Sequence, residues 1–230
     1  MLKLNLGCGK ATFPLNREKP AFADHLSPFL EMQFEPGWIN VDKYGSQGVD
    51  EVIDLFEFPW IRSTTGKTFE DNSVDVIFAS HILEHIPHAV HVSRDCPINH
   101  YRRMVDQVAN LDGWFVFFGE CWRIMKPSAL IYCYTPWALS TPGMCDPTHT
   151  RYILPGTYSY LVDHNDEAPF DYHVPHNFEL VGMPSMRMRA HFTRADGGEP
   201  TAEETLRLAL MNFDSCDELR ITLRAVKDEP

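Results

Sequence analysis

A short glycine turn behind an apolar strand is the part of this sequence best suited to hold a ligand. The segment Asn5-Leu6-Gly7-Cys8-Gly9 follows directly on the strand-like Leu2-Lys3-Leu4. Glycine has no Cβ and tolerates positive φ, so the backbone here can bend sharply and lie against a bound molecule. The same pattern also occurs as an ordinary tight turn. The turn indicates a nucleotide-like ligand only when the neighbouring elements agree with it.

Three further apolar runs end in side chains that suit such a ligand. Residues 38–41 predict a second strand that ends in Asp42, whose carboxylate can accept hydrogen bonds from both hydroxyls of a ribose. Residues 49–55 predict a third strand closing on Asp54 and Leu55, where an adenine amino group would need an acceptor. Residues 73–80 predict a buried parallel strand that leads into His81. Four strand ends are therefore expected to converge.

The segment His81-Ile82-Leu83-Glu84-His85 also matches H-x-x-E-H, the inverted zinc-protease signature. There, two histidines four residues apart share a helix face and the glutamate serves as base. That chemistry needs the motif well inside a helix and a third ligand downstream, whereas this segment directly follows a buried strand. A zinc hydrolase is therefore the less favoured alternative, and we expect no metal ligand. Nearby loop histidines can bind metal adventitiously, although such enrichment is more often incidental: His88, His91 and His100.

A second dense polar stretch is Asp146-Pro147-Thr148-His149-Thr150-Arg151. His149 could accept a proton from a substrate hydroxyl or amine, because an imidazole titrates near neutral pH. Arg151 could orient an anionic substrate. In the alternative interpretation Asp146 and Thr148 form a turn and cap a helix, and His149 is hydrogen-bonded to hold it. Both interpretations stay open at the level of sequence.

The remaining periodicity supplies the elements that position these residues. Apolar residues recur at helical spacing over 101–111 and 115–125, with Asp112-Gly113 as the break between them. Residues 130–135, 179–183 and 219–226 predict three more strands. We expect one domain over residues 1–230, with loop insertions near 10–36, 86–100 and 140–178. The first insertion is predicted to be either a lid or a loop packed by its own phenylalanines.

Composition argues against several function classes. The formal net charge of −12 opposes nucleic-acid binding, which relies on basic side chains that neutralise phosphates. No stretch has the length of a transmembrane helix, and the first residues lack the features of a signal segment, so the expected location is the cytoplasm. The six cysteines form no C-x-x-C pair, which favours reduced core thiols over disulfides or a zinc cluster.

Taken in order, five segments resemble the class I methyltransferases that use S-adenosylmethionine: residues 4–9, 37–42, 54–55, 72–86 and 122–128. The resemblance covers most of residues 1–140 and is specific as an ensemble. It implies a Rossmann-like, doubly wound α/β sheet of about seven strands, mostly parallel with an antiparallel last strand. It also implies S-adenosylmethionine as cofactor and methyl transfer to an oxygen or nitrogen nucleophile. The acceptor, whether a small molecule, a carbohydrate or a protein side chain, is not identified by the sequence.

The resemblance also assigns cofactor-binding residues. Gly7 and Gly9 would let the backbone approach the cofactor, Asp42 would hold the ribose, and Asp54 with Leu55 would contact the adenine. The full set is Asn5, Gly7, Cys8, Gly9, Asp42, Asp54, Leu55, Ser80 and His81. The family usually has an acid where this chain has Asn5, and often a third glycine where it has Ala11. These departures keep a second alternative open, a binding or scaffold protein with a degenerate cofactor pocket.

Overall fold

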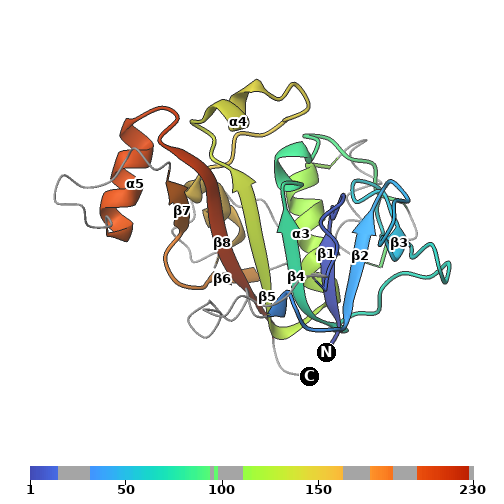
Figure 1. The fold of residues 1–230 in the computed structure, drawn as a ribbon. Helices are drawn as coiled ribbons and strands as arrows, with labels where there is room; N and C mark the ends of the chain where they lie inside the picture. The colour runs from blue at the N-terminus through green and yellow to red at the C-terminus, as the bar shows by residue number, and fades with distance from the viewer. Residues whose placement is uncertain (15–31, 94–95, 98–110, 163–176, 189–200, 228–230) are drawn as a thin grey trace.

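The structure, a computed structural model, describes residues 1–14, 32–93, 96–97, 111–162, 177–188 and 201–227 (Figure 1). Its centre is an eight-stranded sheet in the order β3-β2-β1-β4-β5-β8-β6, with β7 also paired to β8. The strands are β1 (Lys3–Leu6), β2 (Trp38–Asp42), β3 (Glu51–Val52), β4 (Val74–Ser80), β5 (Met125–Pro136), β6 (Asn177–Leu180), β7 (Ser185–Met188) and β8 (Cys216–Val226).

The direction of the strands confirms the predicted fold class. Neighbouring strands from β3 to β5 are all parallel. The last strand, β8, runs antiparallel to β5, β6 and β7. The sheet is therefore mostly parallel, with an antiparallel last strand inserted between β5 and β6. β6 and β7 share one edge of β8, because they pair with its C-terminal and N-terminal halves respectively.

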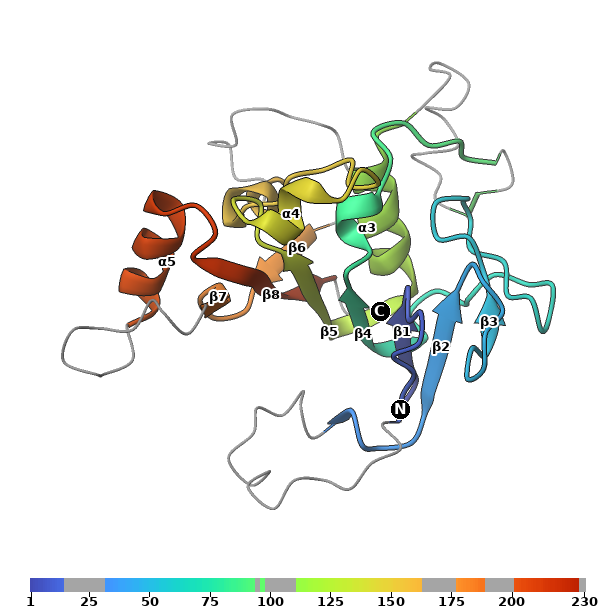
Figure 2. The same ribbon diagram turned by 45° about the horizontal axis from the view of Figure 1, so that its top comes forward.

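Helix α3 (Gly113–Ile124) covers one face of this sheet. The carboxylate of Asp112 accepts a hydrogen bond from the backbone N–H of Trp114 at 2.9 Å, so the break predicted at 112–113 is the helix N-cap. Four buried residues with helical spacing form the packing face: Trp114, Phe117, Phe118 and Cys121. Helix α4 (Thr141–Cys145) follows β5, and α5 (Ala202–Met211) lies beside β7, as Figure 2 shows.

Both faces of the central strands are covered, as expected for parallel strands. Ile77 and Ala79 of β4 belong to the large core that includes α3. Val76 and Phe78 point to the opposite face, where they form a smaller cluster with Phe13 and Trp38. This alternation buries four consecutive residues of β4 and fixes its register between β1 and β5.

The register brings the polar strand ends to one edge of the sheet. Leu6 at the end of β1 lies opposite Val41 of β2 and Ala79 of β4. The residues that follow these three positions therefore lie close together. Backbone hydrogen bonds continue the alignment past the strands, from Cys8 N–H to Val41 O at 3.1 Å and from His81 N–H to Tyr134 O at 2.8 Å.

Some elements differ from the sequence prediction. The third strand contains only Glu51–Val52, because the Asp54 carboxylate accepts a hydrogen bond from Phe56 N–H at 3.0 Å and starts a turn. β7 and α5 were not predicted. The helix predicted at 101–111 and most of the proposed lid lie outside the described residues, apart from the ends of each segment. Among the described helices, none has the length and apolar character that a membrane crossing requires.

Candidate functional site

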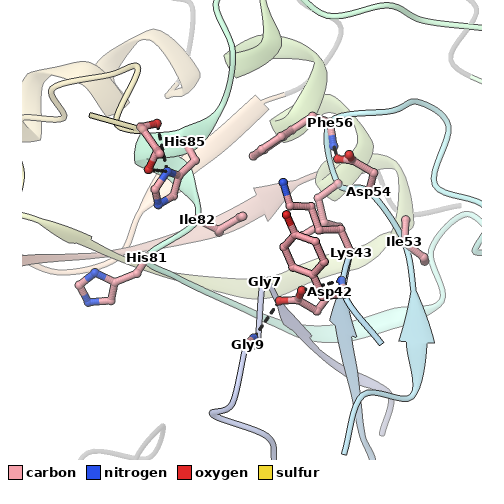
Figure 3. Close-up of a pocket in the computed structure, with 13 residues that line it drawn as sticks. Gly7, Gly9, Asp42, Lys43, Ile53, Asp54, Phe56, His81, Ile82 and His85 are labelled. Carbon is pink, nitrogen blue, oxygen red and sulfur yellow. Dashed lines mark hydrogen bonds between the residues drawn. The ribbon is translucent and has the colours of Figure 1, made fainter. Parts of the chain in front are cut away.

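A cavity of about 530 Å³ lies at the carboxyl ends of β1, β2 and β4 (Figure 3). In open α/β sheets, this edge is where ligands bind. The volume falls within the range of small-molecule sites. The lining residues are Gly7, Gly9, Asp42, Lys43, Tyr44, Ile53, Asp54, Leu55, Phe56, His81, Ile82, His85 and Thr148.

The glycine turn forms one wall of this cavity. Gly7 and Gly9 have φ values of +65° and +51°. A Cβ on Gly7 would lie 2.9 Å from Cβ of Ile82, another wall residue, so this position has no room for a side chain. The carboxylate of Asp42 accepts hydrogen bonds from Gly9 N–H at 2.8 Å and from Tyr44 N–H at 2.9 Å. Asp42 therefore holds the glycine turn against the C-terminal end of β2.

The opposite wall combines one carboxylate with apolar groups. Asp54 lies between the buried side chains of Ile53 and Leu55, and Phe56 follows it. One oxygen of Asp54 holds the local turn through Phe56 N–H. A carboxylate set among apolar side chains suits a flat heteroaromatic ring that carries an amino group.

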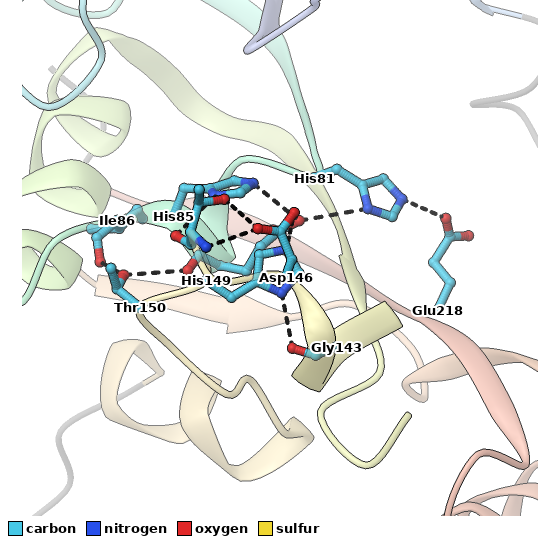
Figure 4. A network of polar contacts seen from close by, with 10 residues as sticks. His81, His85, Ile86, Gly143, Asp146, His149, Thr150 and Glu218 are labelled. Carbon is cyan, nitrogen blue, oxygen red and sulfur yellow. Dashed lines mark hydrogen bonds and ion pairs between the residues drawn. The ribbon is translucent and has the colours of Figure 1, made fainter. Parts of the chain in front are cut away.

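His81 lies on the third side, in a backbone conformation with φ of +54°. Its Nε2 lies 3.1 Å from Oε2 of Glu218, and its Nδ1 lies 3.5 Å from Oε1 of Glu84 (Figure 4). The hydrogen bonds with Glu218 and then Glu84 raise the pKa of His81 to about 9. Burial alone would raise the pKa of Glu218, but hydrogen bonds from His81 and Arg220 hold it at about 2. His81 is therefore an imidazolium at neutral pH and not a general base.

Six of the nine predicted cofactor residues line the cavity: Gly7, Gly9, Asp42, Asp54, Leu55 and His81. Asn5, Cys8 and Ser80 are not among its lining residues. The amide of Asn5 is buried and donates to Ala11 O at 2.8 Å and to Asn40 Oδ1 at 3.0 Å, which ties the glycine turn to β2. Burial raises the pKa of the Cys8 thiol to about 11.

The predicted catalytic residue His149 and substrate-binding residue Arg151 do not line the cavity. Asp146 Oδ1 accepts from Thr148 N–H at 2.8 Å, and Nδ1 of His149 lies 2.9 Å from Gly143 O. The structure thus contains the turn of the alternative interpretation, although Asp146 follows α4 and caps no helix start. Arg151 donates to Ile86 O, Pro87 O and Asp112 Oδ1 at 2.8 to 3.1 Å. Its guanidinium therefore braces the loop after β4.

Several lining residues were missed by the sequence analysis: Lys43, Tyr44, Ile53, Phe56, Ile82, His85 and Thr148. Four of them are adjacent to predicted strand-end residues and Tyr44 is two residues from Asp42, so position along the chain was the only signal. His85 and Thr148 come together from distant segments, with Nδ1 of His85 lying 3.2 Å from Thr148 O. Spacing along the chain gives no sign of that contact.

Comparison with known proteins gives a match in structure only. No protein-family model matches the chain, and no curated protein does. A crystal structure of an S-adenosylmethionine-dependent methyltransferase from Archaeoglobus fulgidus superposes with a TM-score of 0.51 at 17% identity, covering 96% of this chain and 85% of that chain. The YcgJ protein of Bacillus subtilis gives a TM-score of 0.46 at 12% identity, covering 99% of this chain and 92% of that chain.

The likeness to the Archaeoglobus structure extends over nearly the whole of this chain and agrees with the mostly parallel sheet and its antiparallel last strand. At 17% identity the likeness concerns architecture and not substrate. The chain has the Rossmann-like α/β fold found in S-adenosylmethionine-dependent methyltransferases.

Proposed function

We propose that this protein binds S-adenosylmethionine in the cavity at the ends of β1, β2 and β4 and transfers its methyl group to an oxygen or nitrogen nucleophile. The observation that carries the proposal is the pairing of Asp42 with the glycine turn. The Asp42 carboxylate holds Gly9 N–H at 2.8 Å and lines the cavity beside Gly7. A carboxylate has about four lone-pair sites, so it can also accept from ribose hydroxyls.

The other walls fit the remaining parts of the cofactor. Asp54 among Ile53, Leu55 and Phe56 suits the adenine ring and its amino group. Gly7 and Gly9 allow the backbone to approach the amino-acid portion. The imidazolium of His81 supplies a positive charge that suits the cofactor carboxylate.

In the reaction, the acceptor atom attacks the methyl carbon in line with the carbon–sulfur bond. That bond breaks, its electron pair stays on sulfur, and S-adenosylhomocysteine leaves. The sulfonium already activates the methyl group, so the protein mainly fixes the approach geometry. A neutral hydroxyl or ammonium acceptor must also lose a proton. His149, predicted for this task, does not line the cavity, but its ring centroid lies 4.9 Å from that of His85, which does.

Calorimetric titration with S-adenosylhomocysteine tests cofactor binding. Asp42→Ala is expected to weaken binding about 10- to 100-fold, because a hydrogen bond to a charged group contributes about 1.5–3 kcal/mol. Glu57→Gln is the matched control, since this exposed carboxylate lies near Asp54 but does not line the cavity. An unchanged dissociation constant in Asp42→Ala would remove Asp42 from the site. No binding by the intact protein would overturn the proposed function.

A cofactor-binding protein without transferase activity is the second candidate, and the position of Asn5 favours it. Its amide is committed to Ala11 and Asn40, at the position where the resemblance leads one to expect an acid. Binding of S-adenosylhomocysteine, with no methyl transfer to hydroxyl, amine or protein acceptors, would support this candidate. Product formation with any acceptor would exclude it.

A further inference from the structure

Three potential metal ligands meet beside the cavity: Glu84, His85 and His149, of which His85 lines it. Glu84 and His85 belong to a short 3-10 helix after β4 (Leu83–His85), and His149 comes from the segment after α4. One ligand atom from each residue lies within 4.8 Å of the other two. Figure 4 shows His85 and His149 close together. Oε1 of Glu84 lies within ion-pair distance of both His85 and His81.

Both histidines are oriented as metal ligands usually are. Nδ1 of His149 lies 2.9 Å from Gly143 O, and Nδ1 of His85 lies 3.2 Å from Thr148 O. A carbonyl oxygen only accepts hydrogen bonds, so each Nδ1 carries the proton and donates it. In this tautomer the lone pair of the imidazole is on Nε2. Ligating histidines nearly always donate their other N–H to a carbonyl or carboxylate in this way.

The Glu84 carboxylate supplies an independent second observation. Glu84 is only 3% exposed, and its Oε2 has no hydrogen-bond partner among the residues that the structure describes. Its Oε1 lies 4.0 Å from Nε2 of His85 and 3.5 Å from Nδ1 of His81. A buried carboxylate oxygen without a partner is costly, and a bound cation would remove that cost.

We propose that Glu84, His85 and His149 form a binding site for a divalent transition-metal ion such as Zn²⁺. Two imidazoles and one carboxylate are the donor set of many catalytic zinc sites, which keep an open coordination position. Ligand distances of about 2.1 Å require donor atoms roughly 3 to 3.5 Å apart. The side chains therefore draw together by about 1 Å on binding. This site differs from the H-x-x-E-H alternative, because His81 is paired with Glu218 and His149 takes its place.

The location of the site gives it a use in the proposed reaction. His85 and Thr148 line the cavity, so an open coordination position on the ion would face the acceptor. A metal ion lowers the pKa of a bound hydroxyl, and the released proton passes to water. The deprotonated oxygen would then attack the methyl carbon as the carbon–sulfur bond breaks. This step, which selects an oxygen acceptor, rests on the proposed function, whereas metal binding does not.

The competing interpretation is an ion pair between His149 and Asp146. Nε2 of His149 lies 3.7 Å from Oδ2 of Asp146, whose side chain is 45% exposed. In that case His149 needs no metal ion and Glu84 contributes nothing to its environment. Substitution separates the two, because Asp146→Asn breaks the ion pair but leaves the three proposed ligands in place.

The test is a titration of the chelator-stripped full chain with Zn²⁺ in competition with a chromophoric chelator, followed by Co²⁺ with visible absorption. We expect one tightly bound equivalent. His149→Gln and His85→Gln should each weaken binding by about 100-fold or more, because loss of even an outer partner costs 10- to 100-fold. Asp146→Asn should retain the bound equivalent. The matched control is His91→Gln, an exposed histidine outside the cluster, which should bind as wild type does.

Failure to bind a stoichiometric ion, or wild-type affinity in His149→Gln, would overturn the site. Circular dichroism and the thermal midpoint of each variant show whether it is folded. His149 does not line the cavity, so S-adenosylhomocysteine titration of His149→Gln separates the two proposals. Zinc binding without S-adenosylhomocysteine binding would sink the transferase and keep the metal site. S-adenosylhomocysteine binding without zinc binding would overturn the metal site and keep the proposed transferase.

Discussion

The backbone at Gly7 links the stability of the protein to its binding site. With φ of +65°, a side chain here costs about 1–2 kcal/mol in conformation alone. A Cβ would also lie 2.9 Å from Ile82, and such overpacking costs about 1–3 kcal/mol. Gly7→Ala is therefore expected to lower the free energy of unfolding by about 2–5 kcal/mol and to weaken S-adenosylhomocysteine binding. Urea unfolding and calorimetry measure the two effects.

Gly9→Ala is the control for that prediction. Gly9 has φ of +51°, but a Cβ there would meet no atom within 4 Å. Only the conformational cost of about 1–2 kcal/mol should remain. Equal destabilisation by the two substitutions would show that the contact with Ile82 contributes nothing.

The charged His81 gives the molecule a predictable pH dependence. Its pKa rises from 6.5 unfolded to about 9 folded. A raised pKa means that its contribution to stability is complete below about pH 6.5 and is lost as the pH rises through 9. The difference in unfolding free energy between wild type and His81→Gln should therefore be largest near pH 6 and should shrink toward pH 9.5. Urea unfolding across this range measures it, and a constant difference would contradict the assignment.

Direct titration of the imidazole gives a second measurement for the same residue. The NMR shift of the His81 ring should move with a midpoint near pH 9 in wild type. In Glu218→Gln the midpoint should fall toward 6.5, because the hydrogen bond with Glu218 is the largest cause of the raised pKa of His81. His91→Gln, remote from this pair, should leave the midpoint unchanged.

Among the elements, α3 contains a buried ion pair between its own residues Glu120 and Arg123, and both side chains also bond to the segment that precedes β4. Nε and Nη2 of Arg123 donate to the two oxygens of Glu120 at 2.9 and 2.7 Å. Nη1 of Arg123 also donates to Phe69 O at 2.8 Å. Arg123→Met would leave the buried Glu120 carboxylate without its charged partner, with the Trp60 N–H at 3.3 Å as a remaining donor, and we expect a loss of about 3–5 kcal/mol in unfolding free energy.

A double-mutant cycle tests this interpretation. Glu120→Gln with Arg123→Met removes both charges and should be less destabilising than the sum of the two single substitutions. Urea unfolding of the four proteins gives the coupling. Additive losses would mean that the two side chains stabilise α3 independently.

The elements also show what the sequence could predict. β4 and α3 were predicted because their apolar residues follow the period of a fully buried strand and of a helix face. β7 was missed because Ser185, Arg187 and neighbouring residues have no apolar run, and the strand forms by pairing with β8. Strand ends located Asp42 and Asp54 in the cavity wall, because the ends of parallel strands share one edge.

The parts of the site that were not predicted depend on contacts between distant segments. His81 was assigned to the cofactor wall, but its main partner is Glu218, 137 residues away. His149 and Glu84 meet only because the chain after α4 returns to the loop after β4, where Thr150 and Arg151 N–H bond to Glu84 O. No local periodicity encodes such a return. Side-chain pairing at these positions is a product of tertiary structure.

At the scale of the whole molecule, the reactivity of the cysteine thiols tests how well the core is packed. All six are free thiols, and Cys145 is the exposed one while the other five are buried. Burial raises the pKa of Cys216 to about 11 and that of Cys133 still further, so their reactive thiolates are scarce. With a thiol reagent at pH 8 we expect one fast equivalent in the native protein and six in denaturant. Cys145→Ser should remove the fast equivalent, and fast reaction of a second thiol would contradict the described packing.

The position of β8 has a consequence for biosynthesis. Residues 216–226 lie between β5 and β6, although they follow both in sequence. β5 is synthesised about 80 residues before β8. The edge of β5 that pairs with β8 therefore stays unpaired while translation continues. An unpaired strand edge is a template for self-association. Nascent chains stalled before residue 216 should therefore recruit chaperones that chains stalled well beyond β8 do not, and crosslinking on stalled ribosomes would detect the difference.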